Sequence, residues 1–229
     1  MRWTQDKAFV VGTNLPWLSY GGDFGANRWH AQGGVGRPDR IPALRDLLAR
    51  LADEGFTHVR WFMLCDGRAG LRPGADGEPA GLDAFVFRDV DAAAEAIARA
   101  GLRAIFVVFD FHWFLPAVVV DGVQTRGRGD VATGPGPRAR LLERVVAPIL
   151  DRYGRHPSIA AWDVLNEPEW VTRGSARPAA DILDAARRAG YAGALAWSAL
   201  SGDSESDSDA MASALRAFAA APPGLASRA

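Results

Sequence analysis

Five short apolar runs, rich in β-branched and aromatic residues, recur along the chain with segments of helical spacing between them. They are AFVVGTN (8–14), THVRWFML (57–64), RAIFVVFDF (103–111), IAAWDVLN (159–166) and AGALAWSAL (192–200). The first four runs start about 50 residues apart, which leaves room for one helix and its connections in each interval. This alternation predicts an α/β fold in which about five parallel strands form a sheet and helices cover it.

The segments between the runs carry apolar residues at the spacing of an amphipathic helix. Positions i, i+3, i+4 and i+7 are apolar twice, at Leu44, Leu47, Leu48, Leu51 and at Leu142, Val145, Val146, Ile149. Further helices are predicted around residues 90–97, 182–186 and 211–218. Gly55, Gly101 and Gly190 each follow a helical segment, where a left-handed residue commonly ends a helix.

Three long connections rich in glycine, proline and polar residues follow strands rather than helices. They cover residues 15–39, 66–83 and 115–137, whereas the link EGFTH between a helix and the next strand is short. In parallel barrels the loops at the carboxyl ends of the strands build the functional site. We therefore expect function at that edge of the sheet, the alternative being that the long loops are simple insertions.

Composition bounds the remaining possibilities. With 229 residues and 48% apolar side chains, the chain predicts one domain over residues 1–229 with a tail from about 222. The net charge of -1 contains no long run of one sign, so a nucleic-acid partner is not expected. No signal peptide or membrane span is apparent, which predicts a cytoplasmic protein without a membrane partner. The single cysteine, Cys65, is expected to be buried near a strand end.

Polar and aromatic side chains stand at the ends of several predicted strands. They are Arg60 in the second run, Asp110, His112 and Trp113 at the third, Asn166 and Glu167 at the fourth, and Trp197 in the last. A carboxyl group can protonate a glycosidic oxygen, amide and cationic groups can bind hydroxyls, and an indole can pack against a sugar ring. This set predicts a sugar-binding site.

Two other classes of α/β protein are excluded by their motifs. The segment GTNLPWLSYGGDFG after the first run fits neither a dinucleotide-binding nor a P-loop pattern. The four histidines, His30, His58, His112 and His156, are scattered, so no metal site is predicted. No cofactor is expected either.

The segment WDVLNEPEW (162–170) carries the most specific likeness. With Asn166-Glu167-Pro168 at the end of a fourth strand, the chain resembles the retaining glycoside hydrolases of clan A, nearest to the cellulase-like family 5. That resemblance implies a (β/α)8 barrel acting on β-1,4-linked glycans such as mannan or cellulose. It implies Glu167 as the general acid/base and Asn166 as the residue that binds the sugar 2-hydroxyl.

Other residues receive substrate-binding roles from the same resemblance. Arg60 would support the catalytic carboxylates, His112 would belong to a subsite on the third strand, and Trp197 would be a stacking platform. The loop NLPWLSYGGDFG resembles a substrate-facing opening loop, with contacts from Trp17, Tyr20 and Asp23. Each residue also has a plain structural reading: an ion-paired carboxylate for Glu167, a buried ion pair for Arg60, and core packing for His112 and Trp197.

The nucleophile that such a hydrolase needs is not found in the sequence. In the family this carboxylate ends the seventh strand, but eight units of the observed size would need about 400 residues, and the chain has 229. After Asn-Glu-Pro the chain has room for one helix before the run with Trp197. The chain thus resembles a family member without strands five to seven, an incomplete barrel. Glu169, Asp203 and Glu205 are the nearby carboxylates that could substitute.

Three outcomes follow from this gap. A recruited carboxylate would keep hydrolysis of β-glycosides, whereas its absence would leave a sugar-binding remnant without turnover. In the third outcome, the open sheet would expose two unpaired edges, and the chain would misfold or pair with another copy.

Overall fold

The computed structural model describes residues 11–74 and 78–171, except for the side chain of Glu169. Contacts divide the chain into two units, residues 9–166, and residues 1–8 together with 167–229. The first unit contains all the strands and long helices described below. Of the second unit, the structure describes residues 167–171. The predicted fifth strand, the predicted helices and tail beyond residue 171, and Trp197, Asp203 and Glu205 lie outside the described residues.

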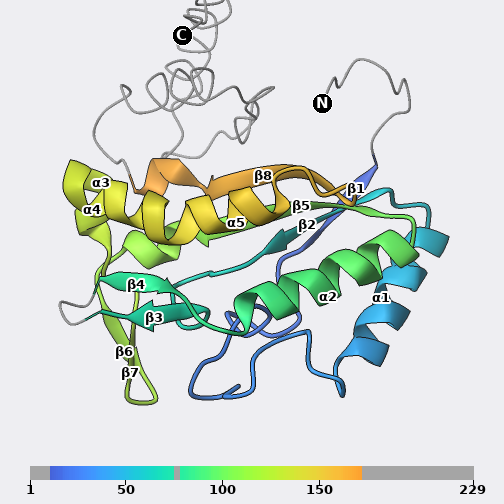
Figure 1. Cartoon of the computed structure of the whole chain (residues 1–229), viewed down its shortest axis with the longest axis horizontal. Coiled ribbons are helices and arrows are strands. Elements are labelled where there is room, and N and C mark those ends of the chain that lie inside the picture. Colours follow the sequence, from blue (N-terminus) through green and yellow to red (C-terminus); the bar gives the residue numbers. More distant parts are fainter. Residues whose placement is uncertain (1–10, 75–77, 172–229) are drawn as a thin grey trace, which may run out of the picture. The chain divides into compact units, whose positions relative to one another are not determined.

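A parallel sheet of four strands forms the centre of the first unit. Strands β1 (Gly12–Leu15), β2 (His58–Phe62), β5 (Arg103–Asp110) and β8 (Ile159–Asn166) are neighbours in that order, which is also their order along the chain (Figure 1). Each overlaps one of the first four apolar runs, although residues 8–10 of the first run lie outside the described residues. The predicted α/β class with a parallel sheet is confirmed. Within the described residues β1 and β8 are the edges of this sheet, and self-association through them stays a prediction.

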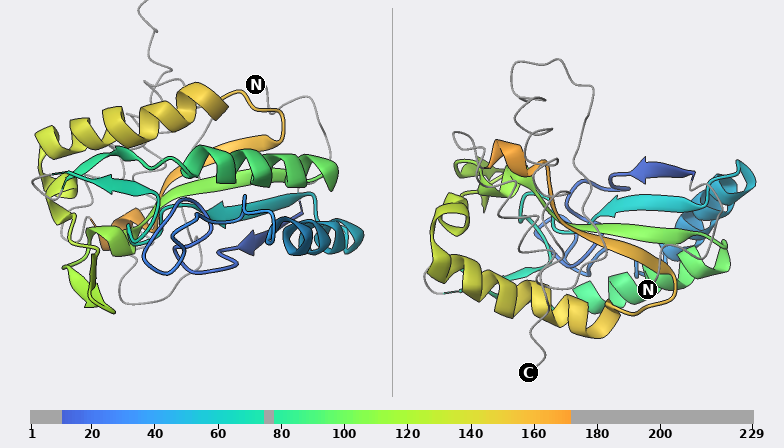
Figure 2. Two further views of the ribbon diagram at one scale, coloured as in Figure 1. Left: turned by 60° about the horizontal axis from the view of Figure 1, so that its bottom comes forward. Right: turned by 90° about the horizontal axis from the view of Figure 1, so that it is seen from above.

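Helices cover one face of the sheet. Helices α1 (Ile41–Asp53), α2 (Val86–Arg99) and α5 (Ala147–Tyr153) pack against the strands, and α2 and α5 lie on one side of them in the right view of Figure 2. Leu44 and Leu48 of α1 and Ile97 of α2 are at most 1% exposed and form the core with Trp61 and Phe106 of the sheet. Val90 and Ala93 of α2 are buried beside them, as their spacing predicts.

Two of the predicted helix ends are confirmed by backbone geometry. Gly55 follows α1 with φ of 92° and Gly101 follows α2 with φ of 72°. Both values lie in the left-handed region, where a residue without a Cβ atom carries no steric cost.

The helix before β8 departs from the predicted pattern. It consists of α4 (Pro135–Leu141), a π-helical stretch over Leu142–Val146, and α5. Leu142 was predicted to face the core, but it is 46% exposed, whereas Leu141 is 5% exposed. A π-helical turn contains more residues than an α-helical turn, so it shifts the buried face by about one position.

The long connections after strands contain structure of their own. An antiparallel pair, β3 (Leu71–Pro73) and β4 (Pro79–Leu82), lies in the connection after β2. After β5 come the 3₁₀ helix Phe111–Phe114, the hairpin of β6 (Val118–Val120) and β7 (Val123–Thr125), and the short helix α3 (Gly129–Thr133). A final 3₁₀ turn, Pro168–Trp170, follows β8. Two of these connections are therefore ordered hairpins at the carboxyl ends of the strands.

The first connection, residues 16–40, contains most of the segment NLPWLSYGGDFG, and the whole connection is called the opening loop from here on. It has almost no regular structure and is held by buried carboxylates. Asp89 of α2 is 0% exposed and accepts hydrogen bonds from the backbone N–H groups of Gly25, Gly34 and Gly36 at 2.7–2.9 Å. Arg88 donates to the same carboxylate at 2.9 Å. Backbone groups that have no sheet or helix partner are thus satisfied by a side chain of α2.

Candidate functional site

A continuous hydrogen-bonded network joins three strands toward their carboxyl ends. Arg60 of β2 donates through Nη2 to Asp163 Oδ2 at 2.5 Å and to Asn166 Oδ1 at 2.9 Å, both on β8. Asn166 donates through Nδ2 to Asp110 Oδ2 on β5 at 2.8 Å. Asp110 in turn pairs with the ring of His112. The structure therefore brings together three of the predicted site residues, Arg60, Asn166 and His112.

Strand order explains why these side chains meet. Strand β5 lies between β2 and β8, so the long guanidinium of Arg60 crosses it to reach β8. Asp110 and Asn166 are the last residues of their strands and are paired in register. Both are at least nine-tenths buried, and each satisfies the other's polar group. Parallel strands thus deliver these residues to one edge.

Arg60 has a partner different from the one predicted. Its ion pair is with Asp163, whose side chain is 31% exposed, and its guanidinium also lies 4.8 Å from the ring centroid of Phe62. Asp163 was not singled out from the sequence. The available signal was a lone carboxylate inside the apolar run IAAWDVLN, opposite a lone arginine inside the run THVRWFML.

His112 is oriented by its neighbours. Asp110 Oδ1 accepts from the backbone N–H of His112 at 3.0 Å and pairs with its Nδ1. The imidazole stacks on Phe111 with ring centroids 4.1 Å apart. Because Nδ1 is engaged, Nε2 is the ring nitrogen that can meet a ligand. The side chain as a whole is 36% exposed.

Glu167 is the first residue of the second unit and has an unusual backbone. Its φ of 50° and ψ of 57° are left-handed, a conformation that costs a non-glycine residue about 1–2 kcal/mol. Pro168 disfavours the right-handed helical conformation for the residue before it, which contributes to this geometry. The Glu167 side chain is partly exposed. Such strained positions are often found at functional sites.

Two aromatic residues of the opening loop, Trp17 and Tyr20, are partly or largely exposed. Trp17 is 43% exposed, and its ring meets those of Tyr20 and Phe62 edge to face at 4.8 and 6.3 Å. Tyr20 is half-buried, and Arg68 lies 4.5 Å from its ring centroid. Burial, followed by the charge of Asp66, raises the pKa of Tyr20, so its hydroxyl stays protonated at neutral pH.

Asp23, which was predicted to contact the substrate, is buried in the structure. Asp23 is 1% exposed, and its carboxylate accepts from the backbone N–H groups of Leu18 and Ser19 at 2.6 and 2.9 Å and from Trp61 Nε1 at 3.0 Å. Arg40 completes the set at 3.4 Å. Burial raises the pKa of Asp23, while these donors oppose that shift. The residue holds the loop against β2 and has no surface for a ligand.

Trp113, also predicted to contact the substrate, is buried as well. Trp113 is 3% exposed and stacks on Phe109 with ring centroids 4.7 Å apart. Its indole lies against Gly67, where an added Cβ atom would be 2.0 Å from Nε1. Trp113 is therefore a core residue that packs two loops together.

Cys65 is buried as predicted, and it has a left-handed φ of 41°. Burial raises the pKa of its thiol to about 12, so it is not a nucleophile at neutral pH.

Within residues 11–74 and 78–171, no three His, Cys, Asp or Glu side chains are grouped so that they could hold a metal ion. None of the helices in the same ranges is both long and apolar enough to cross a membrane.

Comparison with known proteins identifies the fold. No family model matches the chain. A mannan endo-1,4-beta-mannosidase of Cryptopygus antarcticus is 24% identical over 180 residues, which are 76% of this chain and 41% of the relative. The crystal structure of β-1,4-D-mannanase from the same organism matches with a TM-score of 0.56 at 21% identity, covering 71% of this chain and 40% of the mannanase. The chain carries part of a clan A glycoside hydrolase fold.

Two further mannanases share this glycoside hydrolase fold. The β-mannanase of the blue mussel Mytilus edulis gives a TM-score of 0.56 at 20% identity, with 70% of this chain and 41% of that one covered. The endo-1,4-beta-mannanase of Eisenia fetida gives 0.56 at 22% identity, with 73% and 43% covered. The predicted resemblance is confirmed, and the chain spans about two fifths of the length of these glycoside hydrolases.

Replacing Arg60 by Met is expected to lower the free energy of unfolding by about 1–3 kcal/mol, because Asp163 and Asn166 lose a charged donor. Urea denaturation at neutral pH measures the change. Arg45→Met is the matched control: the ion pair of Arg45 with Glu95 is exposed and 3.4 Å long, so its loss should have little effect. Equal losses in the two variants would contradict a specific role for Arg60.

Proposed function

We propose that the protein acts on β-1,4-linked glycans of the mannan type as a retaining glycoside hydrolase. Glu167 is the general acid/base, and the network of Arg60, Asp163, Asn166, Asp110 and His112 binds and orients the sugar. One observation carries the proposal. A polar network converges on the buried Asn166, the residue immediately before Glu167, at the carboxyl end of β8 of a partial glycoside hydrolase fold.

The proposed chemistry follows from these residue types. Glu167 donates a proton to the glycosidic oxygen as the bond to the anomeric carbon breaks, and it later removes a proton from the attacking water. Asn166 is fixed by Arg60 and Asp110, so a sugar hydroxyl meets an amide that needs no reorganisation. His112 presents Nε2 to a neighbouring hydroxyl. Mannan is proposed as the substrate class because the proteins to which this chain is similar are named as mannanases.

Retention also requires a second carboxylate about 5 Å from the acid/base, which forms the covalent glycosyl intermediate. The two carboxylates of the network already have partners, Asp163 with Arg60 and Asp110 with His112 and Asn166. This observation favours a second candidate function, in which the protein binds the same glycans without turning them over.

Hydrolysis of mannopentaose is expected to fall about 10²- to 10⁴-fold in Glu167→Gln, since its leaving group needs protonation. Chromatographic separation of the products measures the rate. Glu143→Gln, the same change at an exposed helix position, is the control and should keep full activity. Full activity in Glu167→Gln would overturn the assignment of this residue.

Azide separates the two candidate functions. Dinitrophenyl β-mannobioside has a leaving group that departs without a proton, so its turnover depends on the nucleophile. Turnover without azide, giving mannobiose, would support the hydrolase. Turnover only with azide, giving an α-mannobiosyl azide, would mean that azide attacks from the face opposite the leaving group because no nucleophile is present. Binding of manno-oligosaccharides without turnover in either condition would favour the binding function.

A further inference from the structure

A small hollow lies apart from the Asn166 network, where the opening loop meets the tip of the β6–β7 hairpin. It measures about 160 Å³ and is lined by Tyr20, Asn27, Trp29, His30, Arg68 and Asp121, together with Val120. Its volume is below the roughly 300–1,000 Å³ of pockets that enclose a whole small ligand. The hollow therefore suits a single ring of a larger molecule.

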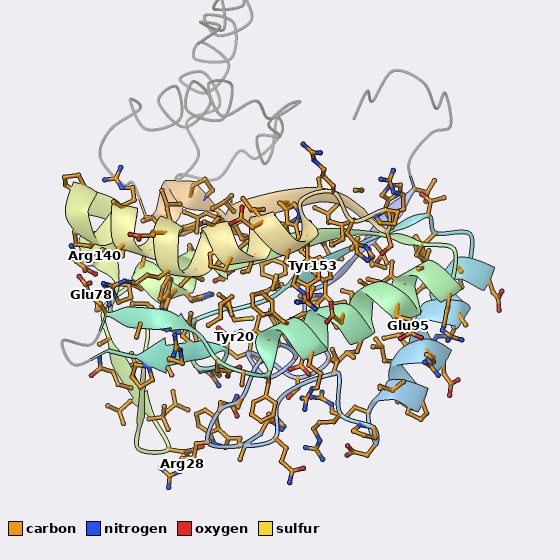
Figure 3. All side chains as sticks on the ribbon, in the orientation of Figure 1. Tyr20, Arg28, Glu78, Glu95, Arg140 and Tyr153 are labelled. Carbon is orange, nitrogen blue, oxygen red and sulfur yellow. The ribbon has the colours of Figure 1, made fainter. Side chains whose placement is uncertain are left out.

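The hairpin is fastened to the opening loop at this hollow. Asp121 Oδ2 accepts from Trp29 Nε1 at 3.1 Å, and the backbone carbonyl of Asp121 accepts from Arg28 Nη1. Figure 3 shows Arg28 beside the tip of the hairpin. Asp121 and Gly122 both have positive φ, 47° and 77°, which is the geometry of a tight Asp-Gly hairpin turn. The turn thus presents Asp121 to the loop in a fixed position.

Trp29 is exposed and yet held in one orientation. Its indole is 37% exposed, its N–H is bound by Asp121, and the guanidinium of Arg68 lies 5.4 Å from its ring centroid. An aromatic side chain that is already ordered loses little further entropy when a ligand packs against it. Exposed apolar surface also gathers on these two segments: among the described residues, five of the seven large exposed hydrophobic side chains are Trp17, Leu18, Trp29, Val118 and Val119. Such gathering is typical of a binding surface.

The polar groups of the hollow suit a neutral ligand with hydroxyl groups. Arg68 is neutralised by a two-point ion pair with Asp66 at 2.9 and 2.7 Å. Burial, followed by the charges of Arg40 and Arg37, lowers the pKa of His30, which keeps this ring neutral at pH 7. Asp121 Oδ1 accepts no hydrogen bond from any described residue, so it can accept one from a hydroxyl. Among the described residues that line the hollow, the one permanently charged cation is Arg68, and its charge is already compensated.

We propose that this hollow is a distal sugar-binding subsite, in which one ring of a β-1,4-linked mannan-type chain packs on Trp29 while a hydroxyl donates to Asp121. The subsite rests on the proposed function for its substrate class and adds a preference for long chains. A disaccharide bound at the Asn166 network has no ring left for the hollow. In this proposal a hexasaccharide occupies both.

Calorimetric titration of the full chain with mannobiose and mannohexaose tests the subsite. The wild type is expected to bind mannohexaose more tightly than mannobiose, and Trp29→Ala is expected to weaken mannohexaose binding about tenfold, reducing that difference. Trp29→Phe keeps a ring but loses the hydrogen bond to Asp121, so its affinity for mannohexaose should fall between those of the wild type and Trp29→Ala. This variant replaces Trp29→Ala in the test if Trp29→Ala does not fold. Leu142→Ala, which removes an exposed apolar side chain from a distant helix, should change neither affinity.

The outcomes separate this inference from the proposed function. A wild type that binds both sugars equally, or a Trp29→Ala variant that keeps the full preference for mannohexaose, would overturn the subsite and leave the proposed function standing. A wild type that binds no manno-oligosaccharide and hydrolyses no dinitrophenyl β-mannobioside would overturn both.

Discussion

Asp89→Ala is expected to lower the free energy of unfolding by about 3–5 kcal/mol, the usual cost of breaking a buried charge pair. The carboxylate is 0% exposed and binds the backbone N–H groups of Gly25, Gly34 and Gly36 as well as Arg88. Truncation leaves these donors buried without an acceptor. Because a domain of this kind is stable by about 5–15 kcal/mol in total, the loss is a large share. Urea denaturation followed by tryptophan fluorescence measures it.

The same variant should loosen the opening loop before it unfolds the sheet. Hydrogen exchange of residues 16–40 is expected to accelerate in Asp89→Ala, while residues 103–110 of β5 keep their relative protection. Asp89→Asn keeps one acceptor oxygen and should lose less stability than Asp89→Ala. Asp46→Ala, at an exposed position of α1, is the control and should exchange like the wild type. Unchanged exchange over 16–40 in Asp89→Ala would show that other contacts hold the loop.

The sequence predicted the strands and helices well because their signals are local. Apolar runs of 4–8 residues and the i, i+3, i+4, i+7 spacing report on residues that are neighbours within one element. Four of the five strand predictions fall wholly or partly on described residues, and a strand of the sheet overlaps each of them. The position of Leu142 was predicted wrongly because the spacing argument assumes a regular α-helix, and the π-helical turn changes the number of residues per turn.

Site residues were predictable where they stand toward the carboxyl end of a predicted strand. Arg60, Asn166 and His112 meet because parallel strands present their carboxyl ends at one edge. Asp163 was missed because it lies inside a strand and its ion pair with Arg60 crosses the intervening strand β5. Such a pair can be predicted only when the order of the strands in the sheet is known.

Two residues were predicted as substrate contacts from their residue type, without information about their burial. Asp23 and Trp113 are chemically suited to bind a sugar, but both are buried, and nothing local in the sequence shows that. The hairpin that carries Asp121 had a usable signal. Asp-Gly flanked by VVV and VQT is a strong sign of a two-residue hairpin turn.

Gly25→Ala is expected to be markedly more destabilising than Gly55→Ala, although both glycines have nearly the same backbone conformation, with φ of 90° and 92°. A Cβ atom at Gly25 would lie 2.2 Å from the Cα atom of Gly70, whereas one at Gly55 would meet nothing within 4 Å. The left-handed strain of about 1–2 kcal/mol is common to the two variants. The clash adds roughly 1–3 kcal/mol to Gly25→Ala alone.

The difference between the two glycine variants therefore measures how tightly the opening loop is packed against the loop after β2. Gly70 cannot yield easily, because its N–H donates to Ala26 at 3.3 Å and its own φ is 79°. Thermal denaturation of both variants gives the comparison, and titration with mannohexaose shows whether displacing the loop also displaces Trp29. Equal melting temperatures would mean that the two loops can separate at no cost. In that case the opening loop would not be a rigid wall for a sugar, and the affinity for mannohexaose should be insensitive to Gly25→Ala.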